Sequence, residues 1–582
     1  MQSTLQTISA YDGSSSAISK WEDTGDKLAN ALATYLRSCM FLEIFSSKNA
    51  QDSQKLASRI DFSLNTLHTK LSLELAQSRT ILARMRNRIL SRFHSILIEI
   101  LSAIFMNIVY APSPDDQTPL PMAKSLKAIF GRLSKLLAVC SFWRNLAVSF
   151  KELWSIVPVA ISGTDQPTHA VISSILERFQ ASLPSNRPLH LAATLPQDYR
   201  LVPLVAGYVP RFTSINIESC TMNSISKLLG GLLPQPASHE VSELSLHEIC
   251  NEYQAELPTE GITDYMWNNR RLFLNLVGSL SILRLRSVNI PWESTTFSNK
   301  LVELRLQSAI LDSNSDLIDV LQALQSAHEL QQLKIISVTS FPDESDGNTP
   351  VAEFTFPNLK SLLLEDLDFN VLRTLLASIV PGHHRLTLFL TPKIQHIYEL
   401  DEEPTEIDIQ EIYELLERTT VDTLLLQGDL EDTVWLDYIE LREILSSLPA
   451  LKTLKMNSWW FNKEDLQALE RPQTTNSDPQ PVNFPNLEKI CIFNSTIRHK
   501  KALYCAMNSH SLHFMELGGR IPRISSDDDA TDGGVSRQNS SIFITHDTDI
   551  VRRLRGIIPH FRLLGPEASS GVDFGQNVWQ LW

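Results

Sequence analysis

Two adjacent histidines and six cysteines are the residues of this chain best suited to holding a metal ion. On a strand, His383 and His384 would point to opposite faces and could not bind one ion together. The cysteines stand far apart without a C-x-x-C pair, which argues against a zinc ribbon or a small disulfide framework. They are Cys39, Cys140, Cys220, Cys250, Cys491 and Cys505. We therefore predict reduced thiols and no metal site.

The motifs of common catalytic and phosphate-binding sites are also missing from the sequence. It contains no G-x-x-x-x-G-K-[ST], no G-x-G-x-x-G and no G-x-S-x-G. The acidic stretch ELDEEPTEIDIQE, starting at Glu399, lacks the central glycine of a calcium loop. We expect a protein that is not an enzyme and uses no cofactor, so binding is the chemistry that remains.

Apolar residues suited to binding gather in a first segment, SILIEILSAIFMNIV, at residues 95–109. Their spacing predicts a helix with one broad apolar face. That face contains Ile100, Leu101, Ile104, Phe105 and Ile108. The following stretch, APSPDDQTPLP at 111–121, is predicted to be a loop because of its prolines.

A second apolar helical segment begins near Ala123 and includes LAVCSFWRNLAVSFKELWSIV at 137–157. One face of it is expected to carry Leu137, Cys140, Leu146 and either Phe142 or Trp143. The two segments together predict a small three-helix domain at 94–165.

Residues 1–93 are predicted to form a helical hairpin. Leu28, Leu32 and Leu36 repeat at helical spacing before the polar break SSKNAQDSQ. A second stripe follows, formed by Leu56, Ile60, Leu64, Leu67, Leu71 and Leu75. Two antiparallel helices that pack on the next domain are favoured, and a free dimeric coiled coil is the alternative.

A six-residue unit, apolar-x-x-apolar-x-apolar, recurs from residue 212 onward. It reads FTSINI, VSELSL, LSILRL, LVELRL, LQQLKI, LKSLLL, LKTLKM, LEKICI and LHFMEL, with looser copies VDTLLL and RLTLFL. Amphipathic helical stretches lie between the copies, among them DLIDVLQALQSA and YIELREILSSL. A strand followed by a helix, repeated in this way along the chain, predicts a solenoid over 166–520. One unit cannot bury its own leucine face, so neighbouring units must stack. The asparagine or cysteine that is usual at the ninth position of leucine-rich repeat units is mostly missing here, so we expect an irregular horseshoe.

The end of the chain is predicted to contain a linker and a cap. Residues 521–545 include SSDDDATDGGVSRQNSS, whose composition favours disorder. Residues 546–582 include IVRRLRGIIPHFRLLG, which could form a final helix that caps the solenoid.

Length and charge limit the partner classes. The chain has 582 residues and a formal net charge of −15, which argues against nucleic acid binding through a large basic surface. No secretory signal opens the sequence, and no apolar run is long enough to span a membrane. We expect a cytoplasmic or nuclear protein that binds neither nucleic acid nor membrane.

The two apolar segments resemble an F-box. Glu99, Ile100, Leu101, Ile104 and Phe105 match L-P-x-E-I-L-x-x-I-F, with Leu97 where proline is usual. Val139, Cys140, Trp143, Arg144, Leu146, Ala147, Leu153 and Trp154 match V-C-x-x-W-R-x-L-A followed by L-W. The whole layout is similar to F-box-like proteins with irregular leucine-rich repeats, of the type expanded in mushroom-forming fungi.

This resemblance implies a substrate-recruiting adaptor of a cullin-based, SCF-type ubiquitin ligase. The F-box-like helices would bind the linker protein, and through it a cullin, while the repeats hold a protein substrate of unknown identity. The implied linker-binding residues are Glu99, Ile100, Leu101, Ile104, Phe105, Val139, Cys140, Trp143, Leu146 and Trp154. Candidate inner-surface residues of the repeats are Glu303, Arg305, Gln332, Lys334, Lys452 and Lys455. The alternative is a repeat scaffold for protein interaction whose F-box-like helices are only a structural cap.

Overall fold

The computed structural model describes residues 2–46, 53–90, 96–110, 121–160, 188–195, 211–234, 241–249, 269–343, 352–399, 403–428, 435–472, 483–522 and 541–565. The chain divides into two compact units, residues 1–101 and 102–582. Of the expected disordered linker 521–545, residues 523–540 lie outside the described residues, whereas 521–522 and 541–543 belong to strands, so the expectation is wrong at both ends. In the part of the chain that the structure describes, no helix is both long enough and apolar enough to cross a membrane.

The first unit consists of helices. Helix α1 (Gln2–Ser46) is followed by α2 (Ser53–Ser63), a π-turn (Leu64–His68) and α3 (Thr69–Leu90), so both helical stretches are long. The hydroxyl of Tyr35 in α1 lies 3.2 Å from the Ser63 hydroxyl and 3.3 Å from Nε2 of His68. These contacts hold the two stretches side by side, while Phe41, Phe62 and many other apolar side chains stay exposed.

Helix α4 (Ile98–Tyr110) spans the division between the units and leads into the second unit. There it is followed by α5 (Met122–Val139), α6 (Ser141–Ser149) and the short 3-10 helix η3 (Lys151–Trp154). The expectation that Leu137, Cys140 and Leu146 share one helical face is wrong. Cys140 is extended, with φ −162° and ψ 168°, and its Sγ accepts a hydrogen bond from the Trp143 amide, which begins a new helix.

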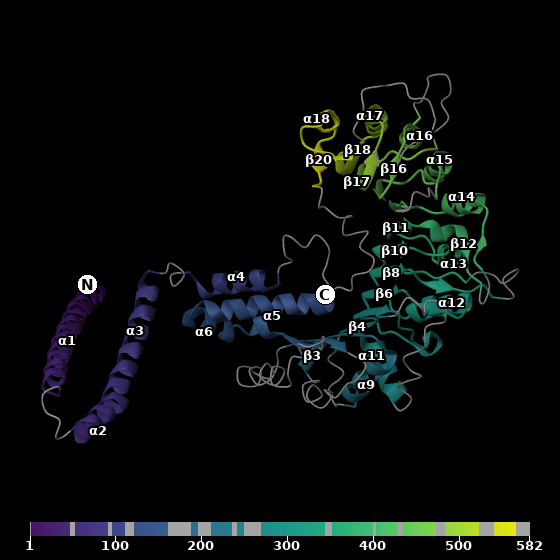
Figure 1. Cartoon of the computed structure of the whole chain (residues 1–582). Helices are drawn as coiled ribbons and strands as arrows, with labels where there is room; N and C mark the ends of the chain where they lie inside the picture. The colour runs from purple at the N-terminus through teal and green to yellow at the C-terminus, as the bar shows by residue number, and fades with distance from the viewer. Residues whose placement is uncertain are drawn as a thin grey trace. The chain divides into compact units, whose positions relative to one another are not determined.

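One large sheet makes up most of the second unit. Its strands are β1 (Ile156–Ala160), β2 (Leu189–Leu195), β3 (Phe212–Ser219), β4 (Glu243–Glu248), β5 (Ile282–Arg286), β6 (Glu303–Gln307), β8 (Gln332–Ile336), β10 (Ser361–Glu365), β11 (Arg385–Leu390), β14 (Thr423–Gln427), β15 (Thr453–Asn457), β16 (Trp460–Phe461), β17 (Lys489–Ile497), β18 (Phe514–Pro522), β19 (Ser541–Phe543) and β20 (His560–Leu563). From β1 to β18 the main strands pair in chain order and in parallel (Figure 1). All the recurring hexamers fall on these strands, which confirms a strand–helix solenoid.

The connections of the solenoid carry its helices. They are α9 (Met222–Leu232), α11 (Arg270–Ser279), η8 (Trp292–Ser294), α12 (Asn314–Leu324), α13 (Phe369–Ser378), η9 (Pro392–Gln395), α14 (Ile409–Glu417), α15 (Tyr438–Ser446), α16 (Lys463–Ala468), α17 (Lys500–Asn508) and α18 (Asp549–Ile557). Capping boxes start α12 at Ser313 and α15 at Asp437, because their side chains bind the first free amides. Small ladders β7 (Ile310–Leu311) with β9 (Thr339–Ser340) and β12 (His396–Ile397) with β13 (Thr405–Glu406) complete the connections.

The helices lie along one flank of the sheet (Figure 1). Leucines of the hexamers, such as Leu304 and Leu306, are fully buried on that flank. Because side chains alternate along a strand, Glu303, Arg305 and their register partners point to the other side. We call this other side the front face.

Several strands end in the same kind of turn. Ser308 after β6 has φ 49°, and five further non-glycine residues among those described are also left-handed: Ser287, Ser337, Asp366, Ser458 and Asn494. All but Asn494 directly follow a strand of the sheet, and Asn494 lies within β17, at its register shift. Small polar side chains tolerate this conformation better than branched ones, so these positions form a second repeat that the hexamers did not reveal.

The two ends of the sheet extend beyond the expected repeats. Strands β1 and β2 precede the first hexamer, so the sheet already starts at Ile156, within the range assigned to the three-helix domain. At the other end, β20 pairs in parallel with β18, so the C-terminal segment adds a strand as well as the expected helix α18.

Candidate partner-binding helix and the front face of the sheet

Helix α4 has one buried and one exposed apolar side. Leu101, Phe105 and Val109 are 1%, 0% and 0% exposed, whereas Ile100, Ile104 and Ile108 are 50%, 36% and 43% exposed. Each set repeats every four residues, so each forms a stripe along the helix. The sequence had placed both sets on one broad face, and the structure divides that face between core and surface.

The buried stripe packs on aromatic residues beyond the proline-rich segment. The rings of Phe105 and Trp143 have centroids 5.0 Å apart, and those of Phe105 and Phe150 are 6.0 Å apart. Hydrogen bonds reinforce the contact, since the Tyr110 hydroxyl donates to the Leu153 carbonyl at 3.0 Å. These contacts fix the rotation of α4, which in turn fixes which side chains remain outside.

The residues implied by the F-box resemblance separate by burial. Leu101, Phe105, Leu146 and Trp154 are buried in the chain's own core, and the Trp154 indole donates to the Ala147 carbonyl at 2.9 Å. Cys140 and Trp143 are half-buried, while Glu99, Ile100, Ile104 and Val139 are exposed. Sequence reasoning did not include Leu97 or Ile108 among the binding residues, although both are exposed and apolar. We call Leu97, Ile100, Ile104 and Ile108 the α4 stripe.

The middle of the front face carries a cluster of charged side chains. Arg284 of β5 forms two hydrogen bonds to Glu303 of β6, at 3.0 and 3.1 Å, and Lys334 of β8 lies 3.5 Å from the same carboxylate. Burial alone would raise the pKa of Glu303, but Arg284 and Lys334 outweigh it and lower the pKa below its ordinary value. Glu303 is therefore ionised at neutral pH.

The candidate inner-surface residues mostly lie where they were expected. Glu303, Arg305, Lys334 and Lys455 share the front face, and Gln332 begins the same face of β8. Lys452 precedes β15. Arg305 donates a 2.7 Å hydrogen bond to Gln307. Beyond them, Nδ1 of His247 lies 3.2 Å from the Glu218 carboxylate, and burial lowers the pKa of His247. The face thus presents both signs of charge.

An apolar cluster on the later strands was missed by the sequence analysis. Phe389, Leu425, Cys491 and Phe493 are buried together, with Phe514 and Leu564 packed against them. The uninterrupted apolar runs in RLTLFL, VDTLLL and the residues LEKICIF could have indicated it, because a strand buried on both faces loses its alternation. Burial raises the pKa of the Cys491 thiol to about 12, so this thiol stays protonated.

No group of three or more His, Cys, Asp or Glu side chains is arranged to hold a metal ion within the described residues. The described cysteines Cys39, Cys140, Cys220, Cys491 and Cys505 form no disulfide.

Comparisons with known proteins give distant matches to solved structures. No protein-family model matches the chain, and no curated protein matches it. Similar structures include the leucine-rich repeat-containing protein LegL7 from Legionella pneumophila, with 14% identity and a TM-score of 0.30, covering 69% of this chain and 97% of that one. A chain of the Rad7 and Elc1 complex in yeast has 12% identity and a TM-score of 0.28, with 61% and 80% covered. An internalin (inlF) from Listeria monocytogenes has 12% identity and a TM-score of 0.26, with 69% and 88% covered. At these values the likenesses carry no conclusion about function.

Proposed function

We propose that this chain is a substrate-recruiting adaptor of a cullin-based ubiquitin ligase. The α4 stripe would bind the linker protein, and the front face of the solenoid would hold a protein substrate. Such an adaptor performs no chemistry itself, because it acts by raising the effective concentration of substrate beside the enzyme.

The observation that carries this proposal is the two-sided burial of α4. Ile100 and Ile104 stay exposed although Leu101 and Phe105, their chain neighbours, are fully packed. An apolar stripe set on a fixed, well-packed helix is the kind of anchor that helix-mediated protein interfaces use. The F-box resemblance of residues 95–109 and 139–154 implies that the partner is the linker protein.

The buried residues of the F-box resemblance have a supporting role in this proposal. Phe105 and Trp143 pack together on the buried side of α4 and fix its orientation, whereas Ile100, Ile104 and Ile108 would contact the linker protein. A rigid support reduces the entropy lost when the partner binds.

The front face suits a protein substrate. Arg284, Glu303 and Lys334 place charges of both signs on adjacent strands, so a partner would be selected by charge pattern. This arrangement favours recognition of a folded or extended protein surface over that of a uniformly charged polymer.

A cap-only role for the helices is supported by a different observation. Helix α5 contacts β1 and β2, and its residues Leu126, Ile129 and Leu133 are buried. The helices therefore cover the first edge of the solenoid. This capping is compatible with partner binding, because α4 keeps its exposed stripe.

The test is co-purification of the full chain with the linker protein. Ile100→Asp and Ile104→Asp should each weaken the complex more than a hundredfold, because a buried unpaired charge costs several kcal/mol. Ile439→Asp is the matched control, since Ile439 is an exposed isoleucine of α15. Unchanged binding by both stripe variants would refute the adaptor role. The remaining function would then be a protein-interaction scaffold whose F-box-like helices are only a structural cap.

A further inference from the structure

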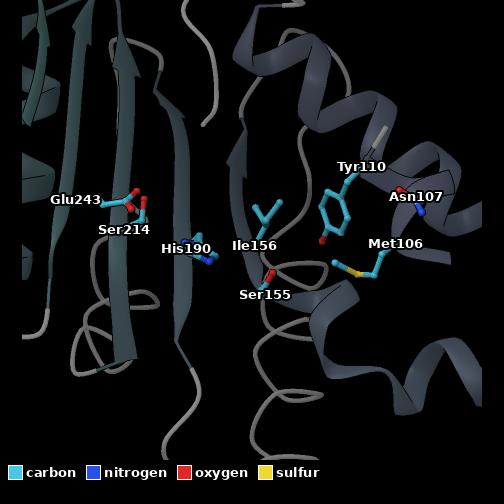
Figure 2. A pocket seen from close by; sticks show the side chains of 8 residues that line it. All are labelled: Met106, Asn107, Tyr110, Ser155, Ile156, His190, Ser214 and Glu243. Atoms are coloured by element: carbon cyan, nitrogen blue, oxygen red, sulfur yellow. The ribbon is translucent and has the colours of Figure 1, made fainter. Parts of the chain in front are cut away.

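A cavity of about 570 Å³ lies where the first four strands of the sheet begin. One wall is a row of side chains paired in register: Ile156 with His190, His190 with Ser214, and Ser214 with Glu243. Figure 2 shows this row leading from Glu243, through His190, to Tyr110 of α4. Met106 and Asn107 of α4 and Ser155 complete the described lining.

The cavity has chemically different ends. Tyr110 and Met106 of α4 lie with Ile156 at one end and offer aromatic and apolar surface, next to the polar but uncharged Asn107 and Ser155 (Figure 2). Ser214 and Glu243 lie at the other end (Figure 2). A ligand that fills the cavity must therefore be apolar at one end and polar at the other.

The charge at the polar end is negative. Glu243 is the one carboxylate among the described lining residues, which include no lysine or arginine. Burial lowers the pKa of His190, and the Glu243 carboxylate offsets this only in part, so at neutral pH the imidazole is uncharged and leaves the negative charge in place. Burial likewise raises the pKa of Tyr110 to about 12, which keeps its phenol neutral. The described lining thus favours a cation beside Glu243.

The length of the row indicates the kind of ligand. Neighbouring strands lie about 4.8 Å apart, so three steps from Ile156 to Glu243 span about 14 Å. About four residue-to-residue steps of extended peptide cover that distance, and side chains four positions apart point to the same side. The polar side chains of His190 and Ser214 lie in the middle of the row, on neighbouring strands, and do not form one compact cage. A compact amine would occupy only the Glu243 end.

We propose that this cavity binds an extended peptide segment with a basic residue at Glu243 and an apolar residue about four positions away, against Tyr110 and Met106. If the proposed function is correct, this peptide segment is part of a ubiquitination substrate, and only this identification rests on the proposed function. The peptide site itself is inferred from the register of β1 to β4 and from the residues of α4 that line the cavity.

The experiment measures binding of blocked pentapeptides to the full chain by isothermal titration. The probes are Lys-Gly-Ala-Gly-Leu, its reverse Leu-Gly-Ala-Gly-Lys, and both peptides with glutamate in place of lysine. At least one lysine peptide should bind, and its glutamate counterpart should bind about ten- to a hundredfold more weakly, as expected for losing a charge-assisted contact. Glu243→Gln should weaken lysine-peptide binding to a similar extent, whereas Glu411→Gln, on the exposed surface of α14, should not.

Three results would overturn the inference. These are the absence of saturable binding by any probe, equal binding of lysine and glutamate peptides, or binding of n-butylamine as tight as that of the lysine peptide. Linker-protein binding is measured on the same samples, and Glu243→Gln should leave it intact. If the peptide binds and the linker protein does not, the adaptor function fails while the peptide site stands.

Discussion

The rings of Phe105 and Trp143 lie with centroids 5.0 Å apart and planes tilted by 49°. This contact joins α4 to α6 across the chain segment 111–120, which separates the two halves of the F-box resemblance. Because Phe105 follows Ile104 directly, the rotation that places the Phe105 ring inside places the Ile104 side chain at the surface. The stripe proposed to bind a partner thus depends on a contact in the core.

A double-mutant cycle should measure this contact. Phe105→Ala should lower the free energy of unfolding by about 3–5 kcal/mol, because a fully buried ring is lost. Combined with Trp143→Ala, the loss should fall short of the sum of the single variants by about 0.5–1.5 kcal/mol, the coupling typical of aromatic pairs. Denaturant titration provides these values. Strict additivity would mean that the two rings do not support each other.

The ion pair on the front face should contribute measurably to stability. Arg284→Gln leaves the Glu303 carboxylate with Lys334 as its remaining basic partner and should destabilise the fold by about 1–3 kcal/mol. Adding Glu303→Gln should recover part of that loss. Arg553→Gln is the control, because the Arg553–Asp549 pair is exposed and should change stability by less than about 0.5 kcal/mol. Equal effects of Arg284→Gln and Arg553→Gln would argue against the pair.

The same ion pair predicts a pH dependence. The pKa of Glu303 is lowered in the folded state, so its stabilising contribution is present above the ordinary glutamate pKa. It is lost as the pH falls through the lowered value. Between pH 7 and pH 3, the parent should therefore lose more stability than the Arg284→Gln, Glu303→Gln double variant. Parallel losses in thermal unfolding would contradict this.

The repeated left-handed turns predict an order of stability at Ser308. Its φ of 49° places a Cβ atom in a strained position, and a branched side chain adds to the strain. Ser308→Val should destabilise by about 1–2 kcal/mol, Ser308→Ala should stay close to the parent, and Ser308→Gly should be at least as stable as the parent. A valine variant as stable as the glycine variant would exclude strain at this turn.

Most strands could be predicted because the hexamer is a local signal. In LVELRL, for example, the pattern identifies Leu301, Leu304 and Leu306 as core, and all three are fully buried. Strand β1 was missed because it reads IVPVA, and a proline argues against a strand. The exception has a physical reason, since β1 is the first strand in the sheet order and Pro158 therefore lies at an edge.

The candidate site was harder to predict because it depends on what covers each side chain. The helical spacing of the apolar residues of α4 does not distinguish those packed inside, such as Leu101, from those outside, such as Ile100. The helix break at Cys140 was also hidden, since it involves neither glycine nor proline. In the row Ile156–His190–Ser214–Glu243, the hexamers FTSINI and VSELSL align Ser214 with Glu243, since each is the third residue of its unit. Ile156 and His190 lie on strands without a hexamer, so the sequence did not place them in the row.

Asp368 predicts a further pH effect, of opposite sign to that of Glu303. Burial raises the pKa of this carboxyl to about 6, although the charge of Lys393 opposes the rise. Between about pH 4 and 6 the folded chain therefore holds a proton that the unfolded chain has released. Stability from this group should fall as the pH rises through that window and stay reduced above it.

Asp368→Asn should remove this pH-dependent loss while keeping the residue as the N-cap of α13. We compare the free energy of unfolding of the variant with that of the parent at each pH. The difference should favour the variant by about 1–3 kcal/mol more at pH 7.5 than at pH 4, because the buried amide carries no charge. Thermal or denaturant unfolding at the two pH values provides the comparison. The control is Asp408→Asn, since Asp408 caps the next helix, α14, from a less buried position. If both variants change equally between the two pH values, the burial of Asp368 is not the cause.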